Sequence, residues 1–450
     1  MTTQDLHGQP LSTTSSATAR AFDHAVHGYL AYRADAPLRV RELLTTDPDF
    51  LFGHLLKGYF SMLAFNLASV PAARDALETA RRLSPGTTRR EQAHVAALAH
   101  WVAGDIDATL QTWEQILDEH PRDVVAFRLH HFLAFWYGRP ESMAKQADTA
   151  LNHWSPELAG WPALLACRCF AHEEIGNYAI AEAAGREAIA LAPGDLWAAH
   201  GVAHVLEMQG RHEDGIAWLT TLEPHWEGGN NLMHHLWWHR GLYHFERREF
   251  AQVLALYDGR FRNLESPLTH AQPDIYIDVQ NAASMLFRLE RQGVDVGNRW
   301  VELADRAEAR IGDCLSTFTL PHWMMALTAA GRFDAADRMI EGMRAFTATG
   351  TGTAVPLVRD CALPISQALV ARAKGDPARA CELMRPALAG MNRLGGSHAQ
   401  QDVLEQLFLD CAVRARRTDD IDALLARVSS RHPVPPDKRV GYAAATSRAN

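Results

Sequence analysis

Long apolar runs are missing from this sequence. No uninterrupted apolar stretch reaches the roughly 18 residues that mark a membrane-spanning helix. The opening MTTQDLHGQPLSTTSSATAR has no apolar core of the kind that a secretory signal carries. We therefore expect a cytoplasmic protein with neither a membrane partner nor a secretory signal.

Cysteine and positive charge are both thinly spread. Six cysteines without metal-ligand spacing favour a reduced cytosolic chain over a disulfide framework. The net charge is −9, so the composition gives no support to a nucleic-acid partner. The strongest basic cluster is interpreted as a solvated helix end and loop: Arg81, Arg82, Arg89 and Arg90.

Familiar catalytic motifs are absent as well. The sequence contains no nucleophile elbow, no phosphate-binding loop and no dinucleotide fingerprint. Almost no segment alternates like a β-strand, whereas helical periodicity continues from Thr18 onward. The apolar share of 47% with 22% charged residues is typical of a well-packed soluble protein.

A repeat of about 34 residues runs through the chain. Helix-turn glycines at Gly104, Gly138, Gly176 and Gly210 are spaced by 34, 38 and 34 residues. One well-formed unit reads GNYAIAEAAGREAIALAP, from a turn glycine through small apolar residues to a proline stop. This pattern is typical of tetratricopeptide repeats. It predicts an all-α, tetratricopeptide-repeat-like α-solenoid, a right-handed superhelix of helical hairpins that encloses a central cavity.

The expected organisation has three parts. Residues 1–17 are predicted to be a flexible leader, residues 18–430 a single superhelix, and residues 431–450 a flexible tail. Arg248 takes the place of the turn glycine in one repeat, and small residues such as Ala181, Ala188 and Gly241 should let paired helices approach closely. Three loops are expected at 227–231, 259–273 and 348–356.

A polar stripe is predicted on the inner wall of the solenoid. In this repeat class the first helix of each hairpin lines the concave face, and LWAAHGVAHVLEMQG places His200, His204 and Glu207 there at i, i+4 and i+7. At about 100° per residue these three side chains share one face. Glu173 occupies the place of Glu207 in the preceding repeat.

The next lining helix adds two more imidazoles. In NNLMHHLWWH, His235 and His239 are again one helical turn apart, with Trp238 between them. We expect an inner wall rich in aromatic and imidazole groups and poor in lysine and arginine. The further candidate binding residues on this wall are Trp197, His131, Asp278, His322 and Trp101.

Three interpretations of this cluster remain open. Neutral imidazoles with a carboxylate suit Zn²⁺, Fe²⁺ or Mn²⁺, and the candidate ligands are His200, His204, Glu207, His235 and His239. A metal-free pocket would use His204 and Glu207 as general acid or base, with His235 and His239 as further catalytic candidates. The third interpretation is structural, because histidines and tryptophans also pack at helix interfaces.

Other histidines have simpler explanations. His172 and His244 fall where the repeat places an aromatic core residue, so we expect core histidines with satisfied hydrogen bonds. His130 and His131 are adjacent and cannot share a face, which favours His131 for the inner wall. His398 and Asp402 form another i, i+4 polar pair at the start of a long helix.

The chain resembles the tetratricopeptide repeat protein 38 family, found in bacteria and animals. The segments that carry the resemblance are AHVLEMQGR, HHLWWHRGLYHFE and GGSHAQQDVLEQLFL, and it extends from about Phe22 to about Arg427. The resemblance implies a helical superhelix. It implies no reaction, since the family has no established activity as a whole.

Two classes of function compete. The favoured hypothesis is an enclosed pocket lined by His, Glu and Trp that binds a small organic molecule and catalyses hydrolysis, elimination or isomerisation on it. The alternative is a non-catalytic scaffold that binds a protein or peptide partner, or a second copy, through the concave face. The carboxylate-clamp form of such scaffolds is disfavoured, because its Lys, Arg and Asn positions here carry residues such as His200, Phe170 and Trp238.

Overall fold

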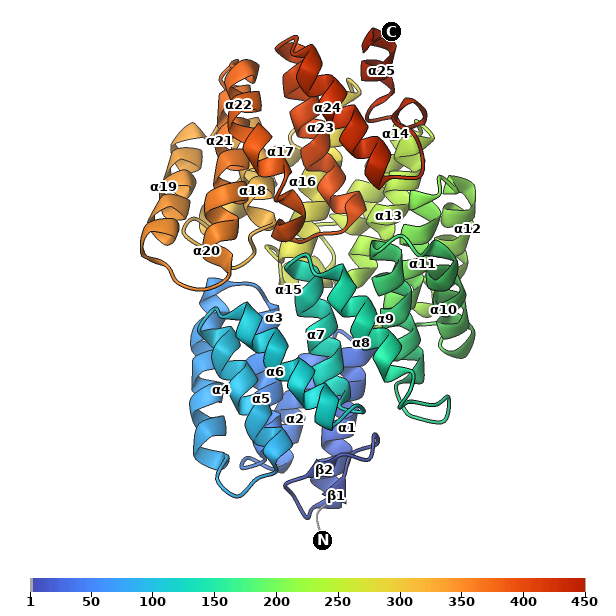
Figure 1. Cartoon of the computed structure of the whole chain (residues 1–450), viewed down its shortest axis with the longest axis vertical. Helices are drawn as coiled ribbons and strands as arrows, with labels where there is room; N and C mark the ends of the chain where they lie inside the picture. The colour runs from blue at the N-terminus through green and yellow to red at the C-terminus, as the bar shows by residue number, and fades with distance from the viewer. Residues whose placement is uncertain (1–2, 450) are drawn as a thin grey trace. The chain divides into compact units, whose positions relative to one another are not determined.

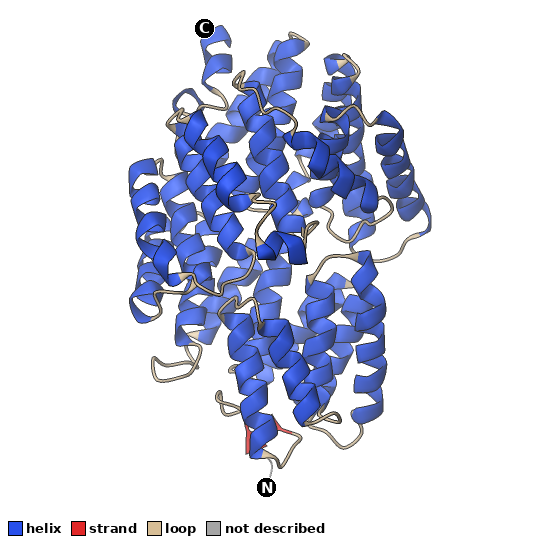
Figure 2. Ribbon diagram, turned by 180° about the vertical axis from the view of Figure 1, so that it is seen from behind, coloured by secondary structure: helices blue, strands red, loops and turns tan. Residues whose placement is uncertain are grey.

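Helices form nearly all of the regular structure. A computed structural model describes residues 3–449, with side chains described as far as residue 446. Within that range the only β-sheet is a pair of two-residue strands, β1 (Thr3–Gln4) and β2 (Pro10–Leu11), as Figure 2 shows. The chain divides into two compact units, unit 1 at Met1–Val202 with Leu222–Leu232 and unit 2 at Ala203–Thr221 with Met233–Asn450.

Unit 1 is built from consecutive antiparallel helices, labelled in Figure 1. Neighbouring helices along the chain pack as hairpins, for example α3 on α4, α5 on α6 and α9 on α10. The helices are α1 (Ser16–Leu30), α2 (Ala36–Thr46), α3 (Leu51–Leu63), α4 (Val70–Leu83), α5 (Arg89–Val102), α6 (Ile106–Glu119), α7 (Val124–Trp136), α8 (Pro140–Ala150), α9 (Trp161–Glu174), α10 (Tyr178–Leu191) and the start of α11 (Leu196–Met208).

Unit 2 continues the same pattern. Its hairpins include α16 on α17, α21 on α22 and α23 on α24. After the end of α11 come α12 (His212–Leu222), α13 (Leu232–Glu246), α14 (Phe250–Leu256), α15 (Pro267–Ala271), α16 (Tyr276–Arg291), α17 (Arg299–Ala309), α18 (Thr319–Ala329), α19 (Phe333–Thr349), α20 (Ala354–Leu357), α21 (Leu363–Ala373), α22 (Pro377–Leu388), α23 (His398–Arg414), α24 (Thr418–Arg431) and α25 (Ala443–Ala449).

The turn glycines lie where the repeat predicts them. Gly104, Gly138, Gly176 and Gly210 follow the first helices of successive hairpins and have φ values of 80°, 63°, 80° and 69°. Only glycine adopts this left-handed conformation without steric cost. Arg248, predicted in the same turn position, has a φ of 60°, which confirms its place in the repeat. The chain is therefore an all-α, tetratricopeptide-like solenoid of helical hairpins.

The predicted extent and course of the superhelix both stay predictions. The sequence predicts one superhelix over residues 18–430, whereas the chain's contacts group into two compact units. The reason is that a hairpin contacts mainly its neighbours, so a stack of hairpins can divide between any two of them. The predicted central cavity and the right-handed course of the superhelix concern the whole chain and stay predictions.

The predicted flexible leader makes specific contacts from residue 3 onward. The β1–β2 hairpin packs on unit 1, where the Ser12 backbone amide donates to the Glu91 carboxylate at 3.0 Å and the Arg90 guanidinium donates to the Pro10 carbonyl at 2.9 Å. Arg90 also pairs with Asp123 at 2.7 Å and is buried. The basic cluster is thus only partly a solvated surface, because one of its four arginines lies inside the unit.

The predicted flexible tail also has fixed contacts. We call residues 432–442 the Arg439 segment. This segment contacts side chains of the helices of unit 2. Arg439 and Tyr442 both reach Asp402, at 2.5 and 2.6 Å. Tyr442 is almost fully buried, so a segment without long helical structure is held by polar contacts.

One stretch passes the length and composition test for a membrane span. It is Ala354–Ala373, which comprises α20, a π-helical turn (Val358–Ala362) and α21, and half of it is buried inside the structure. It is not an uninterrupted apolar run, because Arg359, Asp360 and Arg372 lie within it. α21 packs against α18 and α22, as the core helix of a hairpin does.

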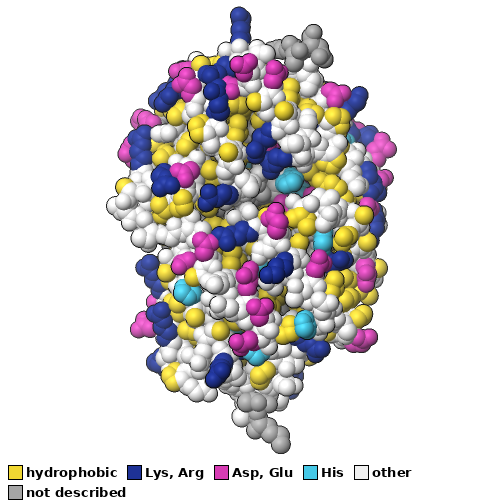
Figure 3. All heavy atoms as spheres, in the orientation of Figure 1, with side chains coloured by type: hydrophobic (Ala, Val, Ile, Leu, Met, Phe, Trp, Pro, Cys, Tyr) yellow, Lys and Arg dark blue, Asp and Glu magenta, His cyan; other side chains and the backbone are white. Residues whose placement is uncertain are grey.

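Charged side chains of both signs are interspersed on the surface. On the face drawn in Figure 3, blue and magenta side chains alternate with apolar ones over the described residues, without a broad field of one sign. Such a mixed surface agrees with the modest net charge of −9.

We predict that close helix packing makes Gly185 intolerant of a side chain. A Cβ there would lie 2.5 Å from Val202 Cγ2 and 2.6 Å from Cys169 Sγ, both compact buried groups. Gly185→Ala should therefore lower the free energy of unfolding by about 1–3 kcal/mol. Urea unfolding followed by circular dichroism measures the change.

Gly259→Ala is the matched control, because it adds the same methyl group where no atom lies within 4 Å. It should be neutral or stabilise the protein by up to ~1 kcal/mol. Equal unfolding midpoints for the two variants would contradict the packing argument.

Candidate functional site

Three histidines of unit 2 converge from two helices. His204 lies on α11, and His235 and His239 lie one turn apart on α13, all at most 2% exposed. One ring nitrogen of each lies within 4.8 Å of the others. The ring centroids of His204 and His239 are 4.3 Å apart, and those of His235 and His239 are 4.7 Å apart. We call these three residues the histidine cluster.

Two of these imidazoles are oriented by hydrogen bonds at Nδ1. His239 Nδ1 lies 2.9 Å from Glu207 Oε2, and His235 Nδ1 lies 2.8 Å from Asn281 Oδ1. The Asn281 amide oxygen can only accept, so the His235 ring carries its proton on Nδ1, and the ionised form of Glu207 fixes the same tautomer of His239. The lone pair of each neutral ring is then on Nε2, as in histidines that bind metals.

Burial keeps the cluster neutral. Desolvation lowers the pKa of His239 to about 3, and it lowers the pKa values of His204 and His235 well below their usual range. The neighbouring imidazoles add to this effect for His204 and His235. All three rings are therefore uncharged near neutral pH, which is the form that ligates a metal ion.

Glu207 forms a hydrogen bond with one ring of the histidine cluster. Burial raises the pKa of Glu207 to about 7, although the Arg288 guanidinium opposes that rise. Its carboxylate contacts the His239 ring, and this contact sets the orientation of the ring. The sequence suggested Glu207 as a metal ligand or a general acid–base group, but the structure places it behind a histidine.

The other predicted residues of α11 and α7 pack inside unit 1. His200 lies one turn before His204, and its ring packs against Phe170 and Trp197 at centroid distances of 5.0 and 4.7 Å. Trp197 Nε1 donates to His131 Nε2 at 3.2 Å. These groups pack together as an aromatic cluster, and their predicted role in binding a substrate stays a prediction.

The remaining tryptophans and Glu173 are also interior. Trp101 packs edge-on against Trp113 at 5.5 Å, and Trp238 stacks on His235 at 5.0 Å with an interplanar angle of 14°. Glu173 on α9 is fully buried. The two tryptophans thus have packing roles, and Trp238 holds a ring of the histidine cluster in place.

Several polar candidates satisfy one another. Asp278 accepts a hydrogen bond from His234 Nδ1 at 2.8 Å, and His322 Nδ1 donates to the Phe318 carbonyl at 2.9 Å. His172 and His244 contact Asp148 and Glu249, which confirms them as core histidines with hydrogen-bond partners. The sequence singled out Asp278 but missed His234, whose only signal was its position one residue before His235.

Sequence reasoning also missed a buried ionic network around Asp402. Arg288 and Arg439 contact its carboxylate at 3.3 and 2.5 Å, and Gln406 and Tyr442 donate to it at 2.6 Å each. Burial alone would raise the pKa of Asp402, but the two guanidinium groups hold it well below its usual value. The expectation of a wall poor in arginine is thus wrong here, because arginines far apart in sequence converge on one acid.

We call the group formed by Glu207, Glu246, Asp402 and Arg288 the acidic recess. Between these groups and the Arg439 segment lies a cavity of about 30 Å³. That volume suits one water molecule or ion. Pockets for small organic molecules are typically 300–1,000 Å³, so this cavity does not fit the predicted organic substrate.

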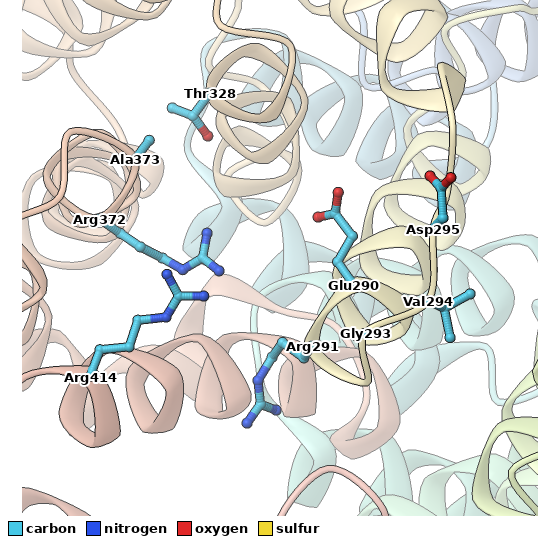
Figure 4. A pocket seen from close by; sticks show the side chains of 9 residues that line it. All are labelled: Glu290, Arg291, Gly293, Val294, Asp295, Thr328, Arg372, Ala373 and Arg414. Atoms are coloured by element: carbon cyan, nitrogen blue, oxygen red, sulfur yellow. The ribbon is translucent and has the colours of Figure 1, made fainter.

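A larger hollow of about 560 Å³ lies elsewhere in unit 2. Figure 4 shows Arg372 and Arg414 next to each other on one side and Glu290 with Asp295 on the other. It is an open hollow at the ends of α16, α18, α21 and α23, and no histidine lines it. Arg372 and Arg414 share the carboxylate of Asp410, so their charges are already partly balanced.

Comparisons with known proteins concern the fold. No protein-family model matches the chain. The chain is similar to the APC/C hetero-tetramer Cut9-Hcn1 (13% identity, 87% of this chain and 76% of that chain, TM-score 0.39) and to yeast Tom70 (11%, 95% and 87%, 0.39). It is also similar to the P58(IPK) TPR domain (12%, 80% and 100%, 0.20).

These similarities are too distant to carry a function. The fold assignment rests on the helical hairpins and left-handed turns of the chain itself. The finer resemblance to the tetratricopeptide repeat protein 38 family stays a prediction.

We predict a pH-dependent stability from Glu246. Burial raises its pKa to about 7 from the ordinary 4.5. A carboxyl group of this kind stabilises the folded state fully below its unfolded pKa, and this contribution is lost as the pH rises through the folded pKa. Between about pH 4.5 and 7 the wild type should lose on the order of 3 kcal/mol of unfolding free energy from this group.

Urea unfolding at a series of pH values tests this expectation. The unfolding free energy of the Glu246→Gln variant should change less with pH across that window than that of the wild type. Glu213 is exposed, so the unfolding free energy of Glu213→Gln should change with pH as it does in the wild type. Parallel curves for wild type and Glu246→Gln would show that Glu246 is not the titrating group.

Proposed function

We propose that the chain is a helical-repeat scaffold that binds an extended segment of a protein partner on the first helices of its hairpins. The observation that supports this is the way unit 2 holds its own Arg439 segment. Side chains from α13, α16 and α23 contact that segment, and each of these helices is the first of a hairpin.

The contacts are of the kind that peptide-binding repeats use. Glu246 accepts the Val440 backbone amide at 2.9 Å, and Arg291 donates to the Gly441 carbonyl at 3.1 Å. Backbone contacts hold an extended chain regardless of its sequence, while side-chain contacts select particular residues. The small-molecule and catalytic hypotheses have less support, since the buried cavity beside Glu207 is only about 30 Å³.

A peptide selection tests the scaffold proposal. The immobilised full chain is exposed to a displayed library of random peptides of about 16 residues, long enough to cross several helices. We expect peptides that bind with micromolar or tighter affinity by fluorescence anisotropy and that compete with one another. A selection that yields no binding peptide would contradict the proposal.

We further propose that the histidine cluster holds a divalent transition-metal ion. Three imidazole nitrogens favour Zn²⁺, with Fe²⁺ and Mn²⁺ as weaker alternatives. The Nδ1 contacts to Glu207 and Asn281 support this proposal, because ligand histidines usually donate their second ring N–H to an oxygen. Three protein ligands also leave a coordination position for water.

Metal content is the direct test. Protein purified without a metal-binding tag or chelator should contain close to one equivalent of metal by elemental analysis. The His204→Ala, His239→Ala double variant should contain none, because two of three ligands are lost. Zn²⁺ added to metal-free wild type at about 100 times its dissociation constant should stabilise folding by about 2.7 kcal/mol.

The matched control is a His172→Ala, His244→Ala double variant, which removes two histidines bound to carboxylates elsewhere. It should keep the wild-type metal content. Equal metal in the cluster variant and the wild type, or none in either, would contradict the metal proposal and leave a buried hydrogen-bonded cluster.

A further inference from the structure

The acidic recess holds more acidic side chains than arginines of its own. Glu207, Glu246 and Asp402 supply three carboxyl groups, whereas Arg288 supplies one guanidinium. Arg439 enters from the Arg439 segment and contacts Asp402 at 2.5 Å. The recess is therefore completed by an arginine that arrives on an extended stretch of chain.

A second side chain of the segment reaches the same acid. Tyr442, three residues after Arg439, donates its hydroxyl hydrogen to Asp402 Oδ1 at 2.6 Å. The Arg439 guanidinium also lies over the Tyr442 ring, 4.6 Å from its centroid. Arginine and tyrosine at this spacing thus form one unit that fits a single carboxylate.

The residues between them are constrained by the backbone. The Val440 amide donates to Glu246 at 2.9 Å, and the Gly441 carbonyl accepts from Arg291 at 3.1 Å. A Cβ on residue 441 would collide with the Gln406 side chain, so only glycine fits there without displacement. The recess therefore selects for arginine, a buried apolar residue such as Val440, glycine and tyrosine in sequence.

We infer that the acidic recess is a docking site for a partner-protein segment that presents Arg-x-Gly-Tyr, and that the chain's own Arg439 segment occupies it in competition. This inference rests on the proposed scaffold function and names the ligand of that scaffold. The partner's arginine and its tyrosine are both favoured by the Asp402 carboxylate, which accepts from Arg439 and Tyr442 in this structure.

The chain's own segment acts as a built-in competitor. A tethered ligand typically has an effective concentration in the millimolar range, so a free peptide of equal intrinsic affinity competes poorly. Residues 432–435, 437 and 438 are partly or fully exposed and contain only a short 3₁₀ turn (Pro436–Lys438), so the apolar burial of the segment is confined to Pro436, Val440 and Tyr442. A partner with additional contacts can therefore replace it.

Gly441→Ala in the full chain provides the test. The added Cβ should weaken the chain's own segment without changing the recess. A fluorescein-labelled peptide with the sequence of residues 434–446 should then bind this variant at least 10-fold more tightly than the wild type by anisotropy. Adding Asp402→Asn to the variant should abolish binding.

Two controls define the specificity. Peptides with Arg439→Ala or Gly441→Ala should not bind the Gly441→Ala chain. The Lys438→Ala chain should bind the wild-type peptide as weakly as the wild type does, because Lys438 is in the same segment but is 72% exposed. Circular dichroism shows whether each variant is folded.

The wild-type chain supplies a second measurement that needs no variant. Saturating peptide should increase hydrogen exchange at the Val440 amide at least 10-fold, because the peptide displaces that amide from Glu246. Unchanged exchange, or peptide binding that is equal in wild type and Gly441→Ala, would overturn the inference. A different outcome is that the selected peptides bind the full chain with an affinity that neither Gly441→Ala nor Asp402→Asn changes. That result would support the scaffold function and overturn this docking site.

Discussion

A single helical hairpin cannot bury its own apolar face, and the structure of both units depends on this constraint. Each hairpin covers the face of the previous one, which requires short turns and close helix approach. The left-handed turn residues, such as Gly176 and Arg248, reverse the chain at each step. Fully buried small residues, such as Ala181 and Ala188, allow the helices to come together.

The same stacking buries polar groups, which then have to be paired. The first helices of unit 2 carry histidine, glutamate and arginine where ordinary repeats carry apolar side chains. Buried polar groups without hydrogen bonds are costly, so these side chains are arranged to satisfy one another. The His239–Glu207 and His234–Asp278 pairs follow from that requirement. So does the Asp402 network, which draws the Arg439 segment into the unit.

Part of the site could be predicted from the sequence and part could not. The i, i+4 spacing of His235 and His239 places them on one side of α13, because helix geometry depends only on local spacing. The convergence of His204 on them, and of Asn281 behind His235, depends on how helices 30 to 80 residues apart pack. The spacing of residues in the sequence does not indicate which of these distant helices come into contact.

The sequence by itself determined the all-α class and the turns at Gly104, Gly138, Gly176, Gly210 and Arg248, since these follow from local periodicity and backbone sterics. Tertiary structure alone decided the roles of the polar side chains. Glu207 orients a histidine, Trp101 packs in a core, and residues 432–442 are held by Asp402 although their composition suggested a flexible tail. The physical reason is that burial and long-range charge pairing set these roles, and both depend on which helices meet.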